Sequence, residues 1–129
     1  ANLCCYEGRL PQGAPTSPIL SNIICQKLDR RLNGLSKKVG AKYSRYADDI
    51  TFSADADVFH LDFKTEMRRI IVDQNFIINE AKVRLQGLGY KQEVTGLVVN
   101  EKVNVSKKYM REIRAMLHNW GKFGYDEAE

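Results

Sequence analysis

Two adjacent acidic residues, Asp48 and Asp49, interrupt the stretch SRYADDITFS, which otherwise alternates apolar and polar residues like a β-strand. Two carboxylates about 5 Å apart repel by roughly 3 kcal/mol at an effective dielectric constant of about 20, and a divalent cation between them reverses that repulsion. Mg²⁺ prefers oxygen ligands and commonly links carboxylates to substrate phosphates. The pair therefore fits a magnesium site. From the dipeptide alone, the alternative is an ordinary solvated turn, where Asp is favoured.

The elements on either side must bend the chain at this pair. Successive side chains on a regular strand point to opposite faces, so neighbouring aspartates can serve one metal ion only where the chain turns sharply. The pattern predicts two short strands, residues 42–47 and 50–54, folded into a hairpin about Asp48-Asp49.

A Gly/Pro-rich loop precedes the hairpin and leads into a helix. We expect Thr16 or Ser17 to cap this helix, Pro18 to lie in its first turn, and Asn33-Gly34 to end it. Its apolar face is predicted to carry Leu20, Ile24, Leu28 and Leu32.

A second amphipathic helix is predicted after the hairpin, followed by extended segments. The apolar residues of this helix, at helical spacing, are Phe59, Phe63, Met67, Ile70 and Ile71. Residues 76–87 predict a short strand, a turn and another extended piece, and residues 93–106 predict a hairpin that turns at residues 100–102.

A third helix is expected at the C-terminal end, with Ser106 as its N-cap. Its apolar face is predicted to carry Tyr109, Ile113, Met116, Leu117 and Trp120. The predicted fold class is therefore α+β, with an antiparallel sheet and helices on one face.

The composition limits the class of protein. A length of 129 residues with 43% hydrophobic content suits one globular unit or a piece of one, and the net charge of +4 favours an anionic partner such as nucleic acid. Neither a membrane span nor a signal peptide is visible, which predicts a cytoplasmic protein without membrane contact. Cys4, Cys5 and Cys25 have neither disulfide nor zinc spacing and are expected to be reduced thiols.

Four motifs occur in an order typical of one enzyme family. YADD (46–49) follows an apolar strand and is preceded some thirty residues upstream by LPQGAPTSP (10–18). Further along are INEAKVRLQG (78–87) and VTGLVVN (94–100). Together, over about residues 10–120, the four motifs resemble those of reverse transcriptases of the bacterial retron and group II intron branch. INEAKVRLQG is similar to the N-x-x-K segment of that family, and VTGLVVN is similar to its Val-Thr-Gly signature. The resemblance implies a partial, RRM-like palm in residues 1–105 and the start of a thumb in residues 106–129.

The resemblance also implies a reaction and roles for single residues. The reaction is the addition of deoxynucleotides to the 3′-hydroxyl of a DNA primer on an RNA template, with two Mg²⁺ ions bound at Asp48 and Asp49. Lys82 resembles the lysine near the departing pyrophosphate, although an ordinary solvated lysine is the alternative and Val83 stands where the family usually has Thr. The implied substrate-binding residues are Gln12, Gly13, Tyr46 and Ala47; for Gln12 and Gly13 the alternative is only a loop before a capped helix. The residues implied to contact nucleic acid are Ser17, Thr95 and Gly96. For Thr95 and Gly96 the alternative is an irregularity within a strand.

Basic residues concentrate in the C-terminal part of the chain. From Lys82 to Lys122 there are nine Lys or Arg and three Glu, a net charge of +6. Phosphate contacts from such residues would give sequence-independent, salt-sensitive binding, and the alternative is a solvated helix face. Tyr109 and Trp120 are expected in the core rather than stacked on bases. The residues expected at phosphates are Lys107, Lys108, Arg111 and Arg114.

Part of the implied site is not visible in this sequence. The family's third metal-binding carboxylate ends an earlier palm strand, and the only acid before the QGAPTSP loop is Glu7, with no strand pattern leading to it. We therefore expect a piece of a polymerase that is inactive alone, and that dimerises or rearranges at the sheet edge left by the missing first strand. Two alternatives stay open: a non-catalytic nucleic-acid-binding module that kept the palm fold, and an RNA-dependent RNA polymerase or nucleotidyl cyclase.

Overall fold

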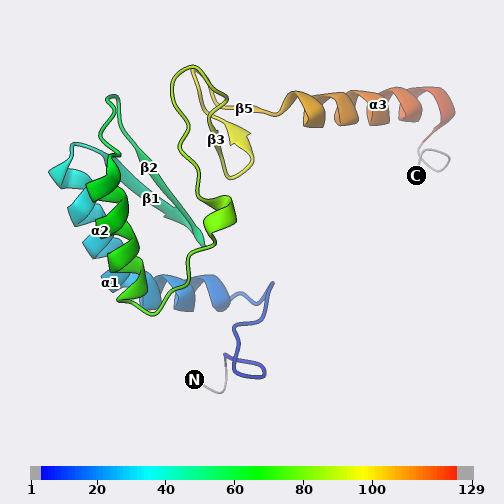
Figure 1. Cartoon of the computed structure of the whole chain (residues 1–129). Coiled ribbons are helices and arrows are strands. Elements are labelled where there is room, and N and C mark those ends of the chain that lie inside the picture. The colour runs from blue at the N-terminus through cyan, green and yellow to red at the C-terminus, as the bar shows by residue number, and fades with distance from the viewer. Residues whose placement is uncertain (1–3, 125–129) are drawn as a thin grey trace. The chain divides into compact units, whose positions relative to one another are not determined.

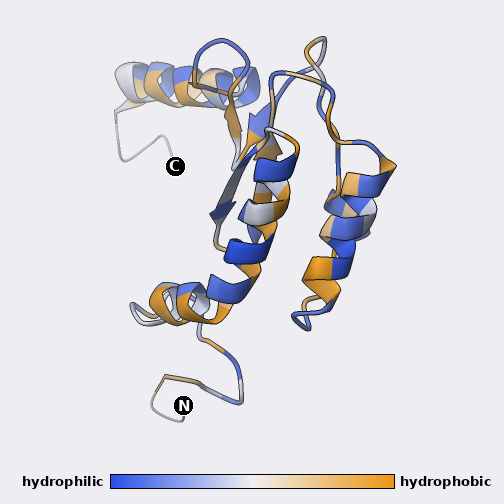
Figure 2. Cartoon of the chain, turned by 90° about the vertical axis from the view of Figure 1, so that its left-hand side faces the viewer, coloured by the Kyte–Doolittle hydropathy of each residue, from blue (hydrophilic) through white to orange (hydrophobic). Residues whose placement is uncertain are grey.

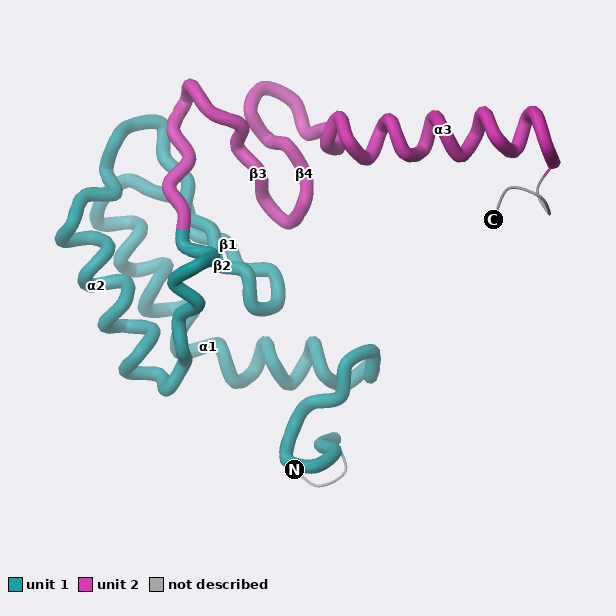
Figure 3. Tube along the Cα trace, turned by 45° about the vertical axis from the view of Figure 1, so that its right-hand side comes forward, with its two compact units in different colours: residues 1–83 teal, residues 84–129 magenta. Residues whose placement is uncertain are grey.

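A computed structural model describes residues 4–124 and divides the chain into two compact units, residues 1–83 and 84–129 (Figure 3). Unit 1 contains α1 (Ser17–Lys38), β1 (Lys42–Tyr46), β2 (Asp49–Ser53), α2 (Leu61–Val72) and the short 3₁₀ helix η1 (Glu80–Lys82). Unit 2 contains β3 (Glu93–Val94), β4 (Leu97–Val98), β5 (Asn104–Val105) and α3 (Lys107–Phe123). The helices and antiparallel strands confirm the α+β class (Figure 1). The division into palm and thumb after residue 105 stays a prediction.

α1 begins at the predicted position. Thr16 occupies the N-cap position and Pro18 lies in the first turn, where its missing N–H leaves no helical hydrogen bond unmade. The Ser17 hydroxyl donates a hydrogen bond of 2.7 Å to the Pro11 carbonyl, which ties the preceding loop to the start of the helix.

The predicted end of α1 at Asn33-Gly34 is wrong, because the helix continues to Lys38. Leu32 and Ser36 are completely buried, and the Ser36 hydroxyl donates to the Asn33 carbonyl at 2.9 Å. The burial of the helical turn that contains Ser36 outweighs the tendency of Asn33-Gly34 to end a helix, since tertiary packing routinely overrides local helix propensity. The helix ends instead before Gly40, whose φ of 71° suits a residue without a side chain.

The apolar face of α1 also differs from the prediction. Leu28 and Leu32 are buried, whereas Ile24 is 63% exposed. Residues spaced by four drift around the helix by about 40° at each step, because an α-helix has 3.6 residues per turn. In addition, only the C-terminal half of α1 lies beside α2, and its N-terminal half extends away from that helix (Figures 1 and 3).

The core of unit 1 forms between α1, α2 and one face of the β1–β2 hairpin. Leu28, Leu32, Ile70 and Ile71 are buried together, and alternation of apolar and polar residues around both helices is visible in Figure 2. The aromatic rings of Phe52, Phe59 and Phe63 extend this cluster. The predicted second amphipathic helix is therefore confirmed, although Phe59 lies before its first residue.

The strands of the described residues form two separate sheets. β1 pairs only with β2, whereas β4 pairs with both β3 and β5, all antiparallel. The strand predicted within residues 76–87 is absent from the described structure, in which η1 is the only regular element there. An extended segment becomes a strand only when a partner accepts its backbone hydrogen bonds, and no partner is in place for this one.

α3 begins as predicted, because the Ser106 hydroxyl accepts a hydrogen bond from the Tyr109 N–H. No residue of α3 is buried in the part of the chain that the structure describes, and Tyr109 is 52% exposed. The expectation that Tyr109 belongs to the core is therefore wrong, and Ile113 and Trp120 of the same stripe are half-buried rather than buried. None of the described helices combines the length and apolar character that a membrane span requires.

Candidate active site at the β1–β2 turn

The paired aspartates stand at a two-residue turn. Tyr46 pairs with Asp49, so Ala47 and Asp48 form the turn, one residue earlier than predicted. Ala47 adopts a φ of 51°, in the left-handed region, which a residue with a Cβ atom occupies at a cost of about 1 to 2 kcal/mol. The tight bend places Asp48 at the tip and Asp49 at the first position of β2.

Both carboxylates are exposed and available to a cation. Within residues 4–124 neither side chain makes an ion pair or a hydrogen bond. No cluster of three or more His, Cys, Asp or Glu residues that could hold a metal ion occurs in that range. Carboxylate oxygens are the donors that Mg²⁺ prefers, and Mg²⁺ usually keeps several waters. Asp48 and Asp49 therefore fit a magnesium ion as two members of a larger ligand set.

A network centred on Arg45 connects this turn to α1. The Arg45 side chain is only 7% exposed, and its Nε and Nη2 each donate to one carboxylate oxygen of Asp29 at 2.8 Å. Its Nη1 donates to the Ala47 carbonyl at 2.8 Å, and Nη2 also reaches Asn22 Oδ1 at 3.1 Å. The Tyr43 hydroxyl donates to Asp29 at 2.6 Å. One guanidinium group therefore contacts both the helix and the turn.

The charges in this network stabilise one another. Hydrogen bonding from Arg45 holds the pKa of Asp29 below its ordinary value, against the opposing effect of burial. Burial, followed by the hydrogen bond to Asp29, raises the pKa of Tyr43, so its hydroxyl remains a donor at neutral pH. Sequence reasoning did not identify these residues. The available signal was a charged residue, Arg45, at an inward position of an alternating strand, which needs a buried partner.

We predict that acid weakens unit 1 through Asp29. Because its folded-state pKa is lowered, its stabilising effect is complete above the ordinary value of 3.8 and is lost as the pH falls through the folded-state pKa. The urea midpoint of the unmodified chain, followed by circular dichroism, should exceed that of Asp29→Asn at neutral pH. The difference should shrink below pH 3.8. A difference that stays constant down to strong acid would contradict this coupling.

The other predicted residues of unit 1 lie on separate elements. Lys82 ends η1, is exposed, and makes no side-chain ion pair among the described residues. Arg68 of α2 holds this segment through Glu80, with Nε–Oε1 and Nη2–Oε2 distances of 3.1 and 2.7 Å. Gln12 and Gly13 lie in the exposed loop before α1, where Gly13 has a φ of 82°. The β1–β2 turn, η1 and the start of α1 lie on the side of unit 1 away from α2 (Figures 1 and 3).

Thr95 and Gly96 form the turn between β3 and β4 in unit 2. Val94 pairs with Leu97, and the two turn residues have φ values of 48° and 83°. Positive φ at both central positions is typical of a type I′ hairpin turn. The pair is therefore a turn, and the alternative of a strand irregularity is wrong.

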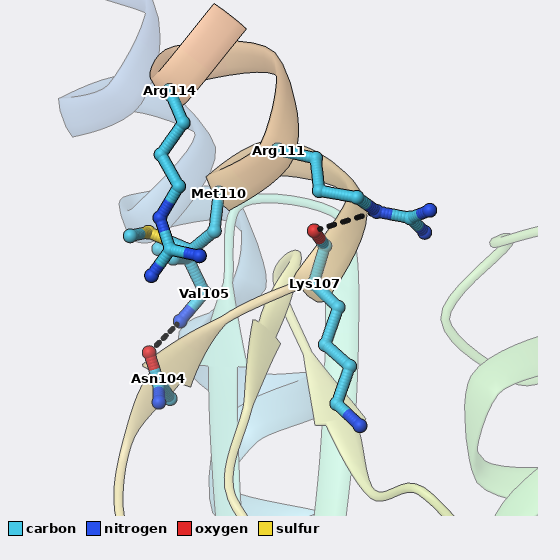
Figure 4. Close-up of a pocket in the computed structure, with 6 residues that line it drawn as sticks. All are labelled: Asn104, Val105, Lys107, Met110, Arg111 and Arg114. Carbon is cyan, nitrogen blue, oxygen red and sulfur yellow. Dashed lines mark hydrogen bonds between the residues drawn. The ribbon is translucent and has the colours of Figure 1, made fainter.

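Basic residues of α3 lie beside an open pocket of about 380 Å³ (Figure 4). Lys107, Arg111 and Arg114 are among its lining residues, with Arg111 pointing away from Arg114 (Figure 4). Lys108 does not line this pocket, and its Nζ lies 3.8 Å from Oε1 of Glu112. Three of the four basic residues expected at phosphates therefore share one surface of unit 2.

Comparisons with known proteins give a consistent result. The family model described as reverse transcriptase (RNA-dependent DNA polymerase) matches residues 5–117. The Retron Ec86 reverse transcriptase of Escherichia coli is 42% identical over 118 residues, which cover 91% of this chain and 37% of that protein. The Retron Mx65 reverse transcriptase of Myxococcus xanthus is 45% identical over 108 residues, 83% of this chain and 25% of that protein. The chain thus spans about a quarter to two fifths of the length of these relatives.

Proposed function

The chain belongs to the reverse transcriptase family, and from this membership we propose that the protein is a retron-type RNA-directed DNA polymerase. It adds deoxynucleotides to the 3′-hydroxyl of a DNA primer on an RNA template. The observation that carries this proposal is the tight turn that presents Asp48 and Asp49, both exposed, within the segment that matches the family.

In this proposal Asp48 is the carboxylate most directly engaged with metal and Asp49 is the second. Two Mg²⁺ ions would supply charge stabilisation at the attacking and leaving oxygens of the nucleotidyl transfer. The chain itself contributes position and space. Tyr46 is 73% exposed, and the small Ala47 leaves room beside Asp48 for the primer end and the incoming nucleotide. Residues 1–105 are assigned to the palm and residues 106–129 to the start of the thumb.

Lys82 is proposed as the cation beside the departing pyrophosphate. Its exposed ammonium group can offset developing negative charge and donate a proton, and the Arg68–Glu80 pair limits the motion of the segment that carries it. Gln12 and Gly13 are proposed to line the nucleotide and template pocket. Gly13 has no side chain at its φ of 82°, so the backbone there can approach a base closely.

The template–primer duplex is proposed to contact the start of α1 at Ser17 and the β3–β4 turn at Thr95 and Gly96. Phosphates are proposed to bind the basic residues of α3, because the lining of the pocket in Figure 4 includes Lys107, Arg111 and Arg114 and no Asp or Glu. Contacts of this kind position the duplex and carry no base specificity.

Replacing Lys107 and Arg114 together with Gln should weaken duplex binding to a similar degree for all base sequences. Each lost phosphate contact reduces the magnitude of the slope of log affinity against log salt concentration by roughly 0.7 to 0.9. The slope of the double variant should therefore be smaller in magnitude by about 1.5. The measurement is duplex binding by the full-length protein over a series of salt concentrations. Lys37→Gln with Lys38→Gln, in the last turn of α1, is the charge-matched control. Equal slopes in the two double variants would reject the proposed phosphate contacts.

Primer extension on an RNA template by the full-length protein, with Mg²⁺ and deoxynucleotides, tests the proposed function. DNA synthesis supports it. A folded protein that binds RNA without synthesis would instead be a nucleic-acid-binding module, and preferential use of ribonucleotides would indicate an RNA polymerase.

The 129-residue chain alone is proposed to be inactive, because its described residues supply only two of the three carboxylates expected for this reaction. We further propose that it either dimerises through the outer edges of the β1–β2 hairpin, which pair with no other described strand, or rearranges locally there. Sedimentation of the chain as a folded monomer would contradict the dimer, and primer extension by the chain alone would contradict its inactivity.

A further inference from the structure

We propose that Arg45 is a positioning residue: it is held by Asp29 of α1 and fixes the Ala47 carbonyl, which sets the position of the Asp48 carboxylate. The inference rests on the polymerase function proposed above, and it assigns a task to residues outside the aspartate pair. A continuous series of contacts, called the path below, leads from the core of unit 1 through Asp29 and Arg45 to the tip of the hairpin.

The path begins in the core. Asp29 follows directly after Leu28, which is 3% exposed, and lies one turn before Leu32, which is completely buried. The helical backbone at Asp29 is therefore fixed by packing on both sides. The Tyr43 hydroxyl donates to the same carboxylate at 2.6 Å, so the Asp29 side chain is fixed as well.

The path continues through a rigid, planar group. A guanidinium is always charged and presents its N–H donors in a fixed fork that matches a carboxylate. With Nε and Nη2 bound to the two Asp29 oxygens, a rotation of the Arg45 guanidinium plane would break at least one of these hydrogen bonds. The direction of Nη1, which donates to the Ala47 carbonyl at 2.8 Å, is thereby determined.

The last member of this series of contacts is the turn at Ala47, whose backbone conformation is unfavourable unless neighbouring groups hold it. Ala47 occupies the left-handed region with φ of 51°, which residues with a Cβ atom adopt only when their surroundings enforce it. The adjacent carboxylates of Asp48 and Asp49 repel each other when no cation lies between them. The hydrogen bond to the Ala47 carbonyl opposes both effects, because it holds the peptide group that links Ala47 to Asp48.

The Arg31–Asp73 pair provides a comparison within the same unit. It is likewise an arginine–carboxylate pair that involves α1, with Nη2 of Arg31 2.9 Å from Oδ2 of Asp73, but it links α1 to the end of α2 and makes no contact with the turn. If Arg45 contributed only to general stability, Arg45→Lys should lower the stability of unit 1 without changing the Mg²⁺ requirement of the folded protein. If Arg45 positions Asp48, only its own replacement should affect the reaction.

The test compares Arg45→Lys with Arg31→Lys in the full-length protein by primer extension on an RNA template. Lysine keeps the charge and can pair with Asp29, but a single ammonium group does not reproduce the planar fork. We expect kcat to fall about 10- to 100-fold in Arg45→Lys, the range found when groups that orient metal ligands are replaced. The KM for deoxynucleotide should change less, and half-maximal activity should require more Mg²⁺, with both variants assayed at a temperature at which circular dichroism shows them folded.

A second measurement does not depend on activity. In the 129-residue chain, Mn²⁺ should broaden the backbone amide signals of Asp48 and Asp49, and Arg45→Lys should require about tenfold more Mn²⁺ for the same broadening. Unchanged kcat and unchanged Mn²⁺ titration in Arg45→Lys would overturn the proposal, as would losses that Arg31→Lys reproduces. Absence of DNA synthesis by the unmodified full-length protein would reject the polymerase function. The Mn²⁺ titration would then decide the positioning role separately.

Discussion

Asp48→Asn should reduce primer extension by the full-length protein by at least about a thousandfold, which corresponds to about 4 kcal/mol of transition-state stabilisation. The substitution keeps the size and shape of the side chain and removes its negative charge. A neutral amide binds a divalent cation weakly, and the charge that develops at the reacting oxygens then lacks its main counterbalance. The turn itself should remain, since its hydrogen bond from Arg45 is made to the backbone of Ala47.

Two further variants make this expectation specific. Asp49→Asn should cause a smaller loss than Asp48→Asn, because Asp49 is the first residue of β2 and is proposed as the less directly engaged acid. Asp55→Asn, an exposed acid in the loop after β2, serves as the charge-matched control and should extend primers at the unmodified rate. Unreduced synthesis by a folded Asp48→Asn protein would exclude this carboxylate from the metal site.

Local patterns in the sequence predicted the elements that carry this site. The alternation around Tyr46 and Ile50 predicted the hairpin, and helical spacing predicted α2 from Phe63 to Ile71. Ser106 predicted the start of α3. Each of these signals depends only on residues close together in the chain, which is why single-sequence reasoning could use them.

The Asp29–Arg45 pair could not be predicted in the same way. Its members are 16 residues apart, on a helix and a strand, and they meet only because α1 packs against β1. The side chain of Arg45 alone predicts that some acid is near, but not which one. The position of the aspartate pair was therefore visible in the sequence, whereas the group that holds it was not.

The sheet shows the same limit. Val94 and Val98 lie in a segment whose composition predicts one strand, the first arm of a hairpin that turns at residues 100–102. Strands form there, but a turn at Thr95-Gly96 divides the segment into β3 and β4. Ile77 and Ile78 have an equally suitable composition, yet no strand forms there in the described structure, and Ile77 is 97% exposed. Strand formation requires a partner with free backbone donors and acceptors, and the composition of the segment does not show whether such a partner is present.

Leu32→Ala should destabilise unit 1 by about 2 to 5 kcal/mol, the range for removing a buried leucine side chain and leaving a cavity. Leu32 is completely buried and contacts the cluster formed with Leu28, Ile70 and Ile71. Since small proteins are stable by only about 5 to 15 kcal/mol, this loss should lower the urea midpoint of the chain strongly, as followed by circular dichroism.

Ile24→Ala is the matched control, because the four-residue spacing predicted Ile24 and Leu32 on one face. At 63% exposure, the Ile24 side chain contributes little to the core, so its truncation should change stability by no more than about 0.5 kcal/mol. A similar loss in the two variants would mean that Ile24 is buried in solution and that the apolar face of α1 follows the four-residue spacing after all. A large loss for Leu32 alone would place the core beside Asp29, where the positioning of the β1–β2 turn requires it.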